Sequence, residues 1–135
     1  MNSTAVRSRT ILVVDDDPDL RGTMQRQLEA FGFRVVLAAD GREGLVKVAR
    51  SQPDVVLCDL TMPVMDGLEF GRRLRANPQH RRVLLIAVTG RNRESDIVDT
   101  WRVGFDRLVE KPVTGDPLAH LIRSRLSRKG EDALG

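Results

Sequence analysis

The sequence predicts a single α/β domain in which a parallel sheet is covered by helices on both faces. Short apolar runs alternate five times with segments of helical periodicity. The runs are only a few residues long and nearly uninterrupted, which is typical of strands buried on both faces. Five strand–helix units joined by right-handed crossovers form a three-layer sandwich. At 135 residues the chain is long enough for one such domain and too short for two ordinary ones.

The first two units begin with strands at residues 11–14 and 34–39. After the first strand, Asp17 is expected to cap a helix that has proline at its first position. The apolar residues of this helix recur at helical spacing: Leu20, Met24, Leu28 and Phe31. After the second strand, Asp40 and Glu43 form a capping-box pattern that predicts the start of a second helix.

The remaining units follow the same alternation. The third strand covers residues 55–59, and Asp66 caps the helix after it. The fourth strand covers residues 83–88 and leads to a helix with three apolar residues: Ile97, Val98 and Trp101. The fifth strand covers residues 108–110, and a final helix has one apolar face: Leu118, Leu121, Ile122 and Leu126. We expect the domain to span residues 9–126, with short flexible tails at 1–8 and 127–135 and no output domain.

Composition excludes several classes of protein. No apolar stretch approaches the ~20 residues that span a bilayer, and the N-terminus lacks an apolar signal-peptide core. The single cysteine, Cys58, cannot form an internal disulfide, so we expect a cytoplasmic protein without a membrane partner. The net charge of +3 comes without a recognition-helix, zinc-finger or aromatic-platform pattern. We therefore interpret the arginines as solvated helix faces or a protein-docking surface, and expect no direct nucleic-acid partner.

Acidic residues stand at the ends of two predicted strands. Asp15 and Asp16 follow the first strand, and Asp59 ends the third. Each of them is an ordinary turn or capping residue when considered alone. If the two strands are neighbours, however, three carboxylates converge, and two unit charges ~4 Å apart repel by about 4 kcal/mol at an effective dielectric near 20. A positive group must then occupy the cluster, and Mg²⁺ is a hard ion that prefers such oxygen ligands.

The ends of the fourth and fifth strands add groups suited to phosphate. Thr89 offers a hydroxyl, and Gly90 leaves room for a backbone N–H to approach the same oxygens. Lys111 supplies a mobile positive charge, and Pro112 after it fixes the backbone in a place where a cis peptide bond is accessible. A strand-end hydroxyl and a solvated loop lysine are the structural alternatives, but a coincidence across four strand ends is improbable.

Four motifs in this order resemble the response-regulator receiver domain of two-component signalling: ILVVDDDPD, VVLCDLTMPVMDG, LLIAVTG and LVEKPV. The resemblance covers about residues 9–126. It implies a flavodoxin-like, doubly wound sandwich with five helices and a five-stranded parallel sheet of order 2-1-3-4-5. It also implies a phosphoprotein that works in signal transduction or a phosphorelay.

The resemblance assigns the site residues as follows. Asp59 is the phosphoacceptor, which takes its phosphoryl group from a phosphohistidine. Asp16, Asp59 and the backbone carbonyl of Thr61 are direct Mg²⁺ ligands, and Asp15 acts through water. Asp17 falls outside the acidic pair and is assigned to helix capping.

Further roles come from the same resemblance. Thr89 is the switch hydroxyl and Lys111 is the phosphate-binding lysine. Many receivers carry an aromatic residue three positions before the lysine, where this chain has Leu108, so an aromatic rotamer switch is not supported here. Trp101 is then a candidate docking residue, with a half-buried packing role as the alternative. From their positions two residues after Asp59 and Thr89, Thr61 and Arg91 are expected to line the route of the attacking water and so to influence the lifetime of the phosphoryl group.

The leading hypothesis is a phosphoacceptor switch that acts through protein–protein contact rather than an enzyme. It promotes only its own phosphorylation and dephosphorylation. Its expected partners are a histidine kinase or phosphotransfer protein and an unknown downstream protein, and we expect a monomer or a weak phosphorylation-dependent dimer. A phosphatase of the haloacid dehalogenase type is the alternative, but it needs an acidic residue where this chain has Thr61. Flavodoxin-like cofactor binding is weaker still, because Asp15 and Asp16 would repel a phosphate.

Overall fold

A computed structural model describes residues 9–62, 64–90 and 94–134 and contains five strands, five α-helices and one 3-10 turn in these residues. In chain order the elements are β1 (Thr10–Val14), α1 (Pro18–Ala30), β2 (Arg34–Ala38), α2 (Gly41–Ser51), β3 (Val55–Asp59), α3 (Gly67–Ala76), η2 (Pro78–His80), β4 (Leu84–Thr89), α4 (Glu94–Val103), β5 (Arg107–Glu110) and α5 (Gly115–Leu134).

The five strands form one parallel sheet in the order β2-β1-β3-β4-β5. The predicted fold class and strand order are confirmed. Because β1 and β3 are neighbours, Val14 lies opposite Cys58, and the residues that follow Val14 reach the same edge as Asp59. Asp59 in turn lies opposite Val88, so β4 ends next to β3.

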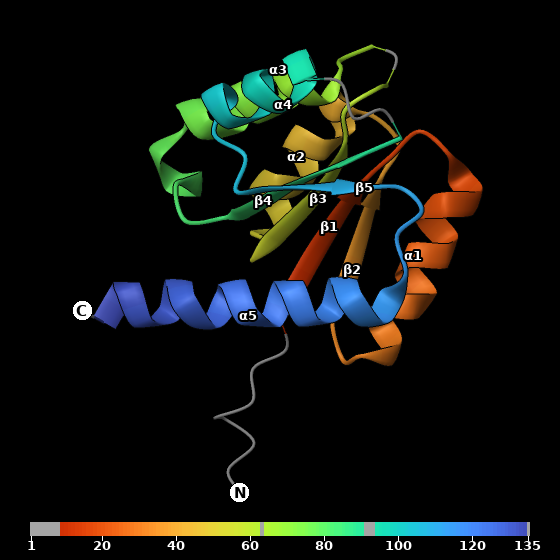
Figure 1. The fold of residues 1–135 in the computed structure, drawn as a ribbon, viewed down its shortest axis with the longest axis vertical. Coiled ribbons are helices and arrows are strands. Elements are labelled where there is room, and N and C mark those ends of the chain that lie inside the picture. Colours follow the sequence, from red (N-terminus) through yellow and green to blue (C-terminus); the bar gives the residue numbers. More distant parts are fainter. Residues whose placement is uncertain (1–8, 63, 91–93, 135) are drawn as a thin grey trace, which may run out of the picture.

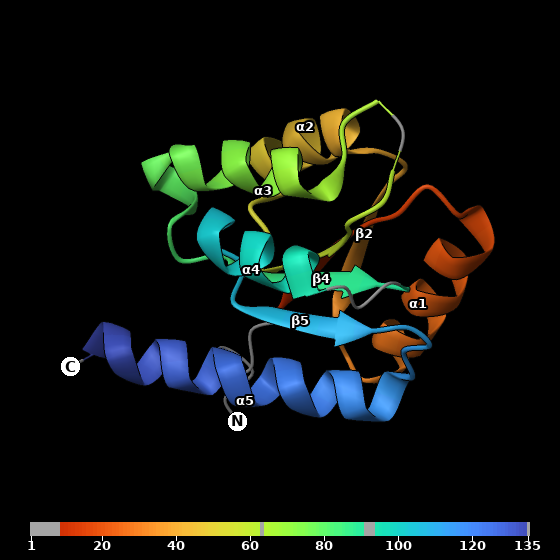
Figure 2. The ribbon, with the colours of Figure 1, turned by 45° about the horizontal axis from the view of Figure 1, so that its top comes forward.

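Helices cover both faces of the sheet, as Figures 1 and 2 show. Alternate residues of each strand point to opposite faces. One core cluster joins Leu12, Val56 and Leu85 with side chains from α2 and α3, and the other joins Ile11, Leu57 and Ile86 with side chains from α1 and α5. The strands are therefore apolar on both faces, which explains their uninterrupted apolar runs.

Aspartates begin the first three helices. Asp17 accepts hydrogen bonds from the backbone N–H groups of Asp19 and Leu20 at α1. Asp40 and Asp66 each accept a bond from the N–H group three residues on, at α2 and α3. The predicted caps are confirmed, and Asp17 makes its cap contacts outside the acidic cluster.

One boundary differs clearly from the prediction. The C-terminal helix α5 continues to Leu134, so a frayed tail beginning at Ser127 is wrong for residues 127–134. That segment was interpreted as a tail because it is polar, but arginine, lysine, glutamate and alanine are good helix formers. The last turns of α5 extend past the sheet (Figure 1). No helix among the described residues is both long and apolar enough to cross a membrane.

Candidate functional site

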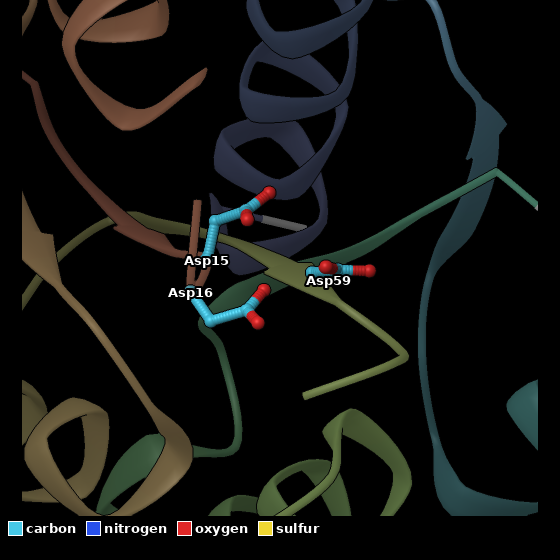
Figure 3. A group of neighbouring side chains, drawn as sticks. All are labelled: Asp15, Asp16 and Asp59. Atoms are coloured by element: carbon cyan, nitrogen blue, oxygen red, sulfur yellow. The ribbon is translucent and has the colours of Figure 1, made fainter. Parts of the chain in front are cut away.

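Three carboxylates gather where β1 and β3 end. Asp15 and Asp16 follow β1 directly, Asp59 is the last residue of β3, and Figure 3 shows their side chains lying together. One oxygen from each carboxylate lies within 4.8 Å of the others. Asp15 and Asp59 are 3% and 7% exposed, whereas Asp16 is open to solvent. The expected convergence of the carboxylates is confirmed.

Lys111 brings a positive charge to this cluster from the end of β5. Its Nζ lies 3.4 Å from Oδ2 of Asp15 and 3.5 Å from Oδ2 of Asp59. The peptide bond between Lys111 and Pro112 is cis. Lys111 thus contacts carboxylates from both neighbouring strands.

The end of β4 lies beside the end of β5. Thr89 is the last residue of β4 and is 2% exposed. Its carbonyl oxygen accepts a 2.8 Å hydrogen bond from the backbone N–H of Lys111. A Cβ atom added to Gly90 would meet no atom within 4 Å, so the space beside this glycine is open. Arg91 lies outside the described residues.

The chain turns sharply after Asp59. The backbone N–H of Thr61 donates a 3.2 Å hydrogen bond to Oδ1 of Asp59. The N–H of Gly67 donates to the carbonyl of Leu60 at 3.0 Å, which closes the loop at the start of α3. A Cβ on Gly67 would lie 2.4 Å from the carbonyl oxygen of Asp59. Only glycine permits α3 to begin this close to Asp59.

Several neighbouring groups shift the pKa of Asp59 in opposite directions. Burial raises the pKa of its carboxyl above the usual value, and the negative charge of Asp15 raises it further. The hydrogen bond from Thr61 and the ammonium of Lys111 act in the opposite direction. Burial also raises the pKa of the Cys58 thiol, so this side chain is an inert, neutral core residue.

The donor set suits a hard divalent cation. Three carboxylates and the single ammonium of Lys111 leave two net negative charges in the cluster. All of the ligand atoms are oxygens, which Mg²⁺ and Ca²⁺ prefer. The residues present therefore fit a bound divalent metal ion.

Two contacts around Asp15 were not predicted. Arg21, on the second turn of α1, donates a 2.7 Å hydrogen bond to the carbonyl oxygen of Asp15. The backbone N–H of Asp17 donates to Oδ1 of Asp15 at 2.9 Å. The acidic triplet is the signal that could have indicated the second contact, because an aspartate often accepts a hydrogen bond from the N–H two residues on. Nothing local indicates that the Arg21 side chain turns back toward the strand.

Leu108 and Trp101 are not members of the acidic cluster. Leu108 is half-buried and packs on the core cluster that also receives Val103 of α4. Trp101 is 50% exposed on α4, and Val98 one turn before it is also exposed. The surface of α4 therefore presents apolar side chains to solvent.

Comparison with known proteins agrees with this geometry. The family model for the response regulator receiver domain matches residues 11–123. Transcriptional regulatory protein YxdJ of Bacillus subtilis (strain 168) is 36% identical over 87% of this chain and 50% of its own length. The chain spans about half the length of the curated relatives it matches.

Solved structures show the same fold. A CheY-like response regulator receiver domain protein from Methanospirillum hungatei JF-1 has a TM-score of 0.88 and 28% identity, covering 93% of this chain and 99% of its own. The receiver domain of sensor histidine kinase PA1611 from Pseudomonas aeruginosa PAO1 has a TM-score of 0.82 and 29% identity, covering 90% and 99%. That structure has a magnesium ion coordinated in its active site cleft. The matched segment carries the acidic cluster and all of the five described strands except Thr10, the first residue of β1, and the chain belongs to the response regulator receiver domain family.

Proposed function

We propose that this chain is a phosphoacceptor switch whose acceptor is Asp59. The observation that carries the proposal is the buried Asp59 carboxylate, with Asp15 and Asp16 within 4.8 Å and the Nζ of Lys111 at 3.5 Å. Anionic and cationic groups meet there at the carboxyl edge of a parallel sheet, where α/β proteins bind their ligands. The family match over residues 11–123 supports this choice over a haloacid dehalogenase phosphatase.

The proposed step transfers a phosphoryl group from a phosphohistidine to Asp59. A carboxylate oxygen of Asp59 attacks phosphorus in line, forming a P–O bond as the P–N bond to the imidazole breaks. The imidazole leaves with the electron pair of that bond and takes a proton from solvent. Lys111, whose Nζ lies 3.5 Å from Oδ2 of Asp59, would neutralise charge on the phosphoryl oxygens. The product is an acyl phosphate that carries about one more negative charge than the carboxylate.

Mg²⁺ is the proposed metal. Asp16, Asp59 and the backbone carbonyl of Thr61 would hold it directly, and Asp15 would act through water. When bound, it would offset negative charge on the phosphoryl group. The magnesium ion in the active site cleft of the PA1611 receiver domain supports this choice over other divalent ions.

The proposed switch couples the phosphoryl group to the surface through Thr89. The Thr89 hydroxyl and the backbone at Gly90 would bond phosphoryl oxygens, drawing the end of β4 toward Asp59. Such coupling is typically worth 1–3 kcal/mol, which shifts an equilibrium about 5- to 150-fold. Leu108 packs on the same core cluster as Val103 of α4, so we propose that α4 carries the output without an aromatic rotamer change.

The proposed partners are a histidine kinase or phosphotransfer protein on the donor side and an unidentified protein on the output side. Trp101 on α4 is the proposed output contact because its side chain is half exposed. We expect Trp101→Ala to weaken output binding with the fold intact. Unchanged binding of the output protein would contradict this role.

The experiment that tests the proposal combines intact mass with tryptophan fluorescence. The protein is incubated with acetyl phosphate, with and without Mg²⁺, beside Asp59→Asn. We expect one phosphoryl adduct that requires both Mg²⁺ and Asp59, accompanied by a change in Trp101 fluorescence. An adduct that persists in Asp59→Asn would refute Asp59 as the acceptor.

A further inference from the structure

Among its described residues, the loop between β3 and α3 presents one large apolar side chain to solvent. Leu60, Met62 and Met65 are all buried, at 8%, 8% and 9% exposed. Val64 is 76% exposed, the highest value among the large apolar side chains of the described residues. The loop therefore buries its other described apolar side chains and leaves Val64 outside.

The backbone of Val64 is also unusual. Its φ is +72°, in the left-handed region that β-branched residues rarely adopt. The loop is anchored on both sides of it, by the hydrogen bond from Gly67 to Leu60 and by Met65, which packs directly on Gly41 at the start of α2. Neither the strained backbone nor the exposed methyl groups stabilise the fold. Strained residues of this kind cluster at functional sites.

Val64 lies within reach of any protein that docks over Asp59. It is three residues from Gly67, so the Cα atoms of these two residues are at most about 11 Å apart. Gly67 in turn lies directly on Asp59, since a Cβ added to it would be 2.4 Å from the carbonyl oxygen of Asp59. An interface of standard size buries about 800 Å² on each partner, which corresponds to a disc of roughly 16 Å radius. A protein that brings a phosphohistidine to Asp59 would therefore cover Val64. The other exposed large apolar side chains of the described residues lie on helices: Val46 on α2, and Val98 and Trp101 on α4.

We propose that Val64 is a positioning contact for the protein that donates the phosphoryl group. Its isopropyl group packs against an apolar patch beside the donor's phosphohistidine and helps to align that histidine with Asp59. A small donor such as acetyl phosphate makes no such contact. The inference rests on the proposed function, because it requires a protein donor for Asp59.

The test compares a protein donor with a small one. Purified histidine kinase cores are autophosphorylated with ATP, and the core that transfers fastest to this chain is used as the donor. Val64→Asn keeps the left-handed backbone accessible and removes the apolar contact, and Val64→Gly does the same without any side chain. Val46→Asn on α2 is the matched control, because it also removes an exposed valine. Valine and asparagine have similar helix propensities, so α2 should keep its stability.

We expect kcat/KM for transfer from the kinase to fall about tenfold in both Val64 variants, the scale of a strong interface contact. The rate of labelling by acetyl phosphate should stay unchanged in them, and Val46→Asn should match the unsubstituted chain with both donors. The proposal would be overturned if the kinase transferred to the Val64 variants and to the unsubstituted chain at equal rates. It would also be overturned if the variants lost rate equally with both donors, because that result indicates a disturbed acceptor site.

The two proposals fail in distinguishable ways. If acetyl phosphate labels Asp59 but no kinase core transfers to the chain, the positioning role of Val64 is overturned and the acceptor chemistry stands. If neither donor labels Asp59 in the unsubstituted chain, the proposed function itself is overturned, and the role of Val64 with it.

Discussion

Asp59 combines burial with a neighbouring like charge, and both work against its ionised form. Its carboxylate lies beside Asp15 at the end of β3, with the ammonium of Lys111 and the N–H of Thr61 as the compensating groups. The raised pKa of Asp59 shows that compensation is incomplete without a metal ion. An acceptor carboxylate held in this way is stabilised by whatever cation joins it.

This balance predicts how Asp59 affects stability at different pH. Because the pKa of Asp59 is raised in the folded state, ionising it costs the folded protein more than the unfolded chain. Stability is therefore lost as the pH rises from the ordinary pKa of aspartate, about 4, through the raised pKa of Asp59. In EDTA at neutral pH we expect Asp59→Asn to be more stable than the unsubstituted protein, because it removes the cost of ionising Asp59 in the folded state. Urea denaturation at several pH values measures the difference, which should disappear below the ordinary aspartate value.

Asp54 provides the matched control for that experiment. Its carboxylate accepts a 2.9 Å hydrogen bond from the backbone N–H of Thr10 and lies outside the acidic cluster. Asp54→Asn should therefore not gain stability. A loss of stability in Asp59→Asn, of the size seen in Asp54→Asn, would contradict the electrostatic account.

At the scale of elements, the approach of α3 to β3 depends on one glycine. A Cβ on Gly67 would lie 2.4 Å from the carbonyl oxygen of Asp59 and 2.7 Å from Cα of Leu60. Both are backbone atoms that cannot turn aside, so α3 or the loop that carries Thr61 must shift. We expect Gly67→Ala to lose about 1–3 kcal/mol of stability and to slow labelling of Asp59 by acetyl phosphate.

Gly22 in α1 is the control for this substitution. A Cβ there would meet only the end of the Arg26 side chain, at 3.4 Å. Gly22→Ala should stabilise the protein by about 0.5–1 kcal/mol, because alanine favours a helix interior. If the two variants changed stability equally, the close approach at Gly67 would not be the cause.

The side chain of Arg75 connects α3 to neighbouring segments of the fold. Arg75 on α3 donates hydrogen bonds to the carbonyl groups of Gly104, His80 and Arg81 and forms a 2.9 Å ion pair with Asp106. Its side chain is mostly buried. These contacts tie the end of α3 to the segments before β4 and β5.

We expect Arg75→Ala to lose about 2–4 kcal/mol, because it removes a mostly buried side chain together with its ion pair to Asp106 and its hydrogen bonds to three carbonyl groups. Arg75→Lys should recover only part of this loss, since lysine lacks the planar fork of arginine. Arg73, paired with Glu69 on the exposed side of the same helix, is the control and should change stability by about 0.5 kcal/mol or less when replaced by alanine. Thermal unfolding of the three variants measures these differences. Similar losses of stability at Arg75 and Arg73 would refute the proposed role of the Arg75 contacts.

At the scale of the whole molecule, strand order brings together charges that are far apart in the chain. Asp15, Asp59 and Lys111 come from three strands and meet at one edge of the sheet. A cation that binds only this assembled cluster must stabilise the entire fold. At a concentration one hundred times Kd, the gain is about 2.7 kcal/mol.

Unfolding in increasing Mg²⁺ tests this linkage. We expect the free energy of unfolding to rise with the logarithm of Mg²⁺ concentration above Kd, and the rise to be lost in Asp16→Asn. Asp19, an exposed aspartate in the first turn of α1, is the control, and Asp19→Asn should keep the full effect. If Mg²⁺ stabilised Asp16→Asn as much as the unsubstituted protein, the ion would be bound elsewhere.

Local sequence patterns are sufficient to predict the alternation of elements, their caps and the polar residues at the strand ends. These features depend on local physics: an apolar run of strand length, an aspartate before a helix and a glycine after it. Asp17, Asp40 and Asp66 cap the helices they were expected to cap, and Asp59 ends its strand. The strand order came from the resemblance of four motifs, since no local pattern places β1 between β2 and β3.

Contacts between groups on different elements become visible only in the folded molecule. Three features join residues from separate elements. They are the contacts of Lys111 with two carboxylates, the close approach of Gly67 to Asp59 and the hydrogen bonds of Arg75. The left-handed backbone of Val64 likewise follows from anchors on both sides of its loop. Such contacts depend on strand register and helix packing, which arise from the whole chain at once. A local pattern predicts which residues form the site, and the packing of the sheet determines the distances between them.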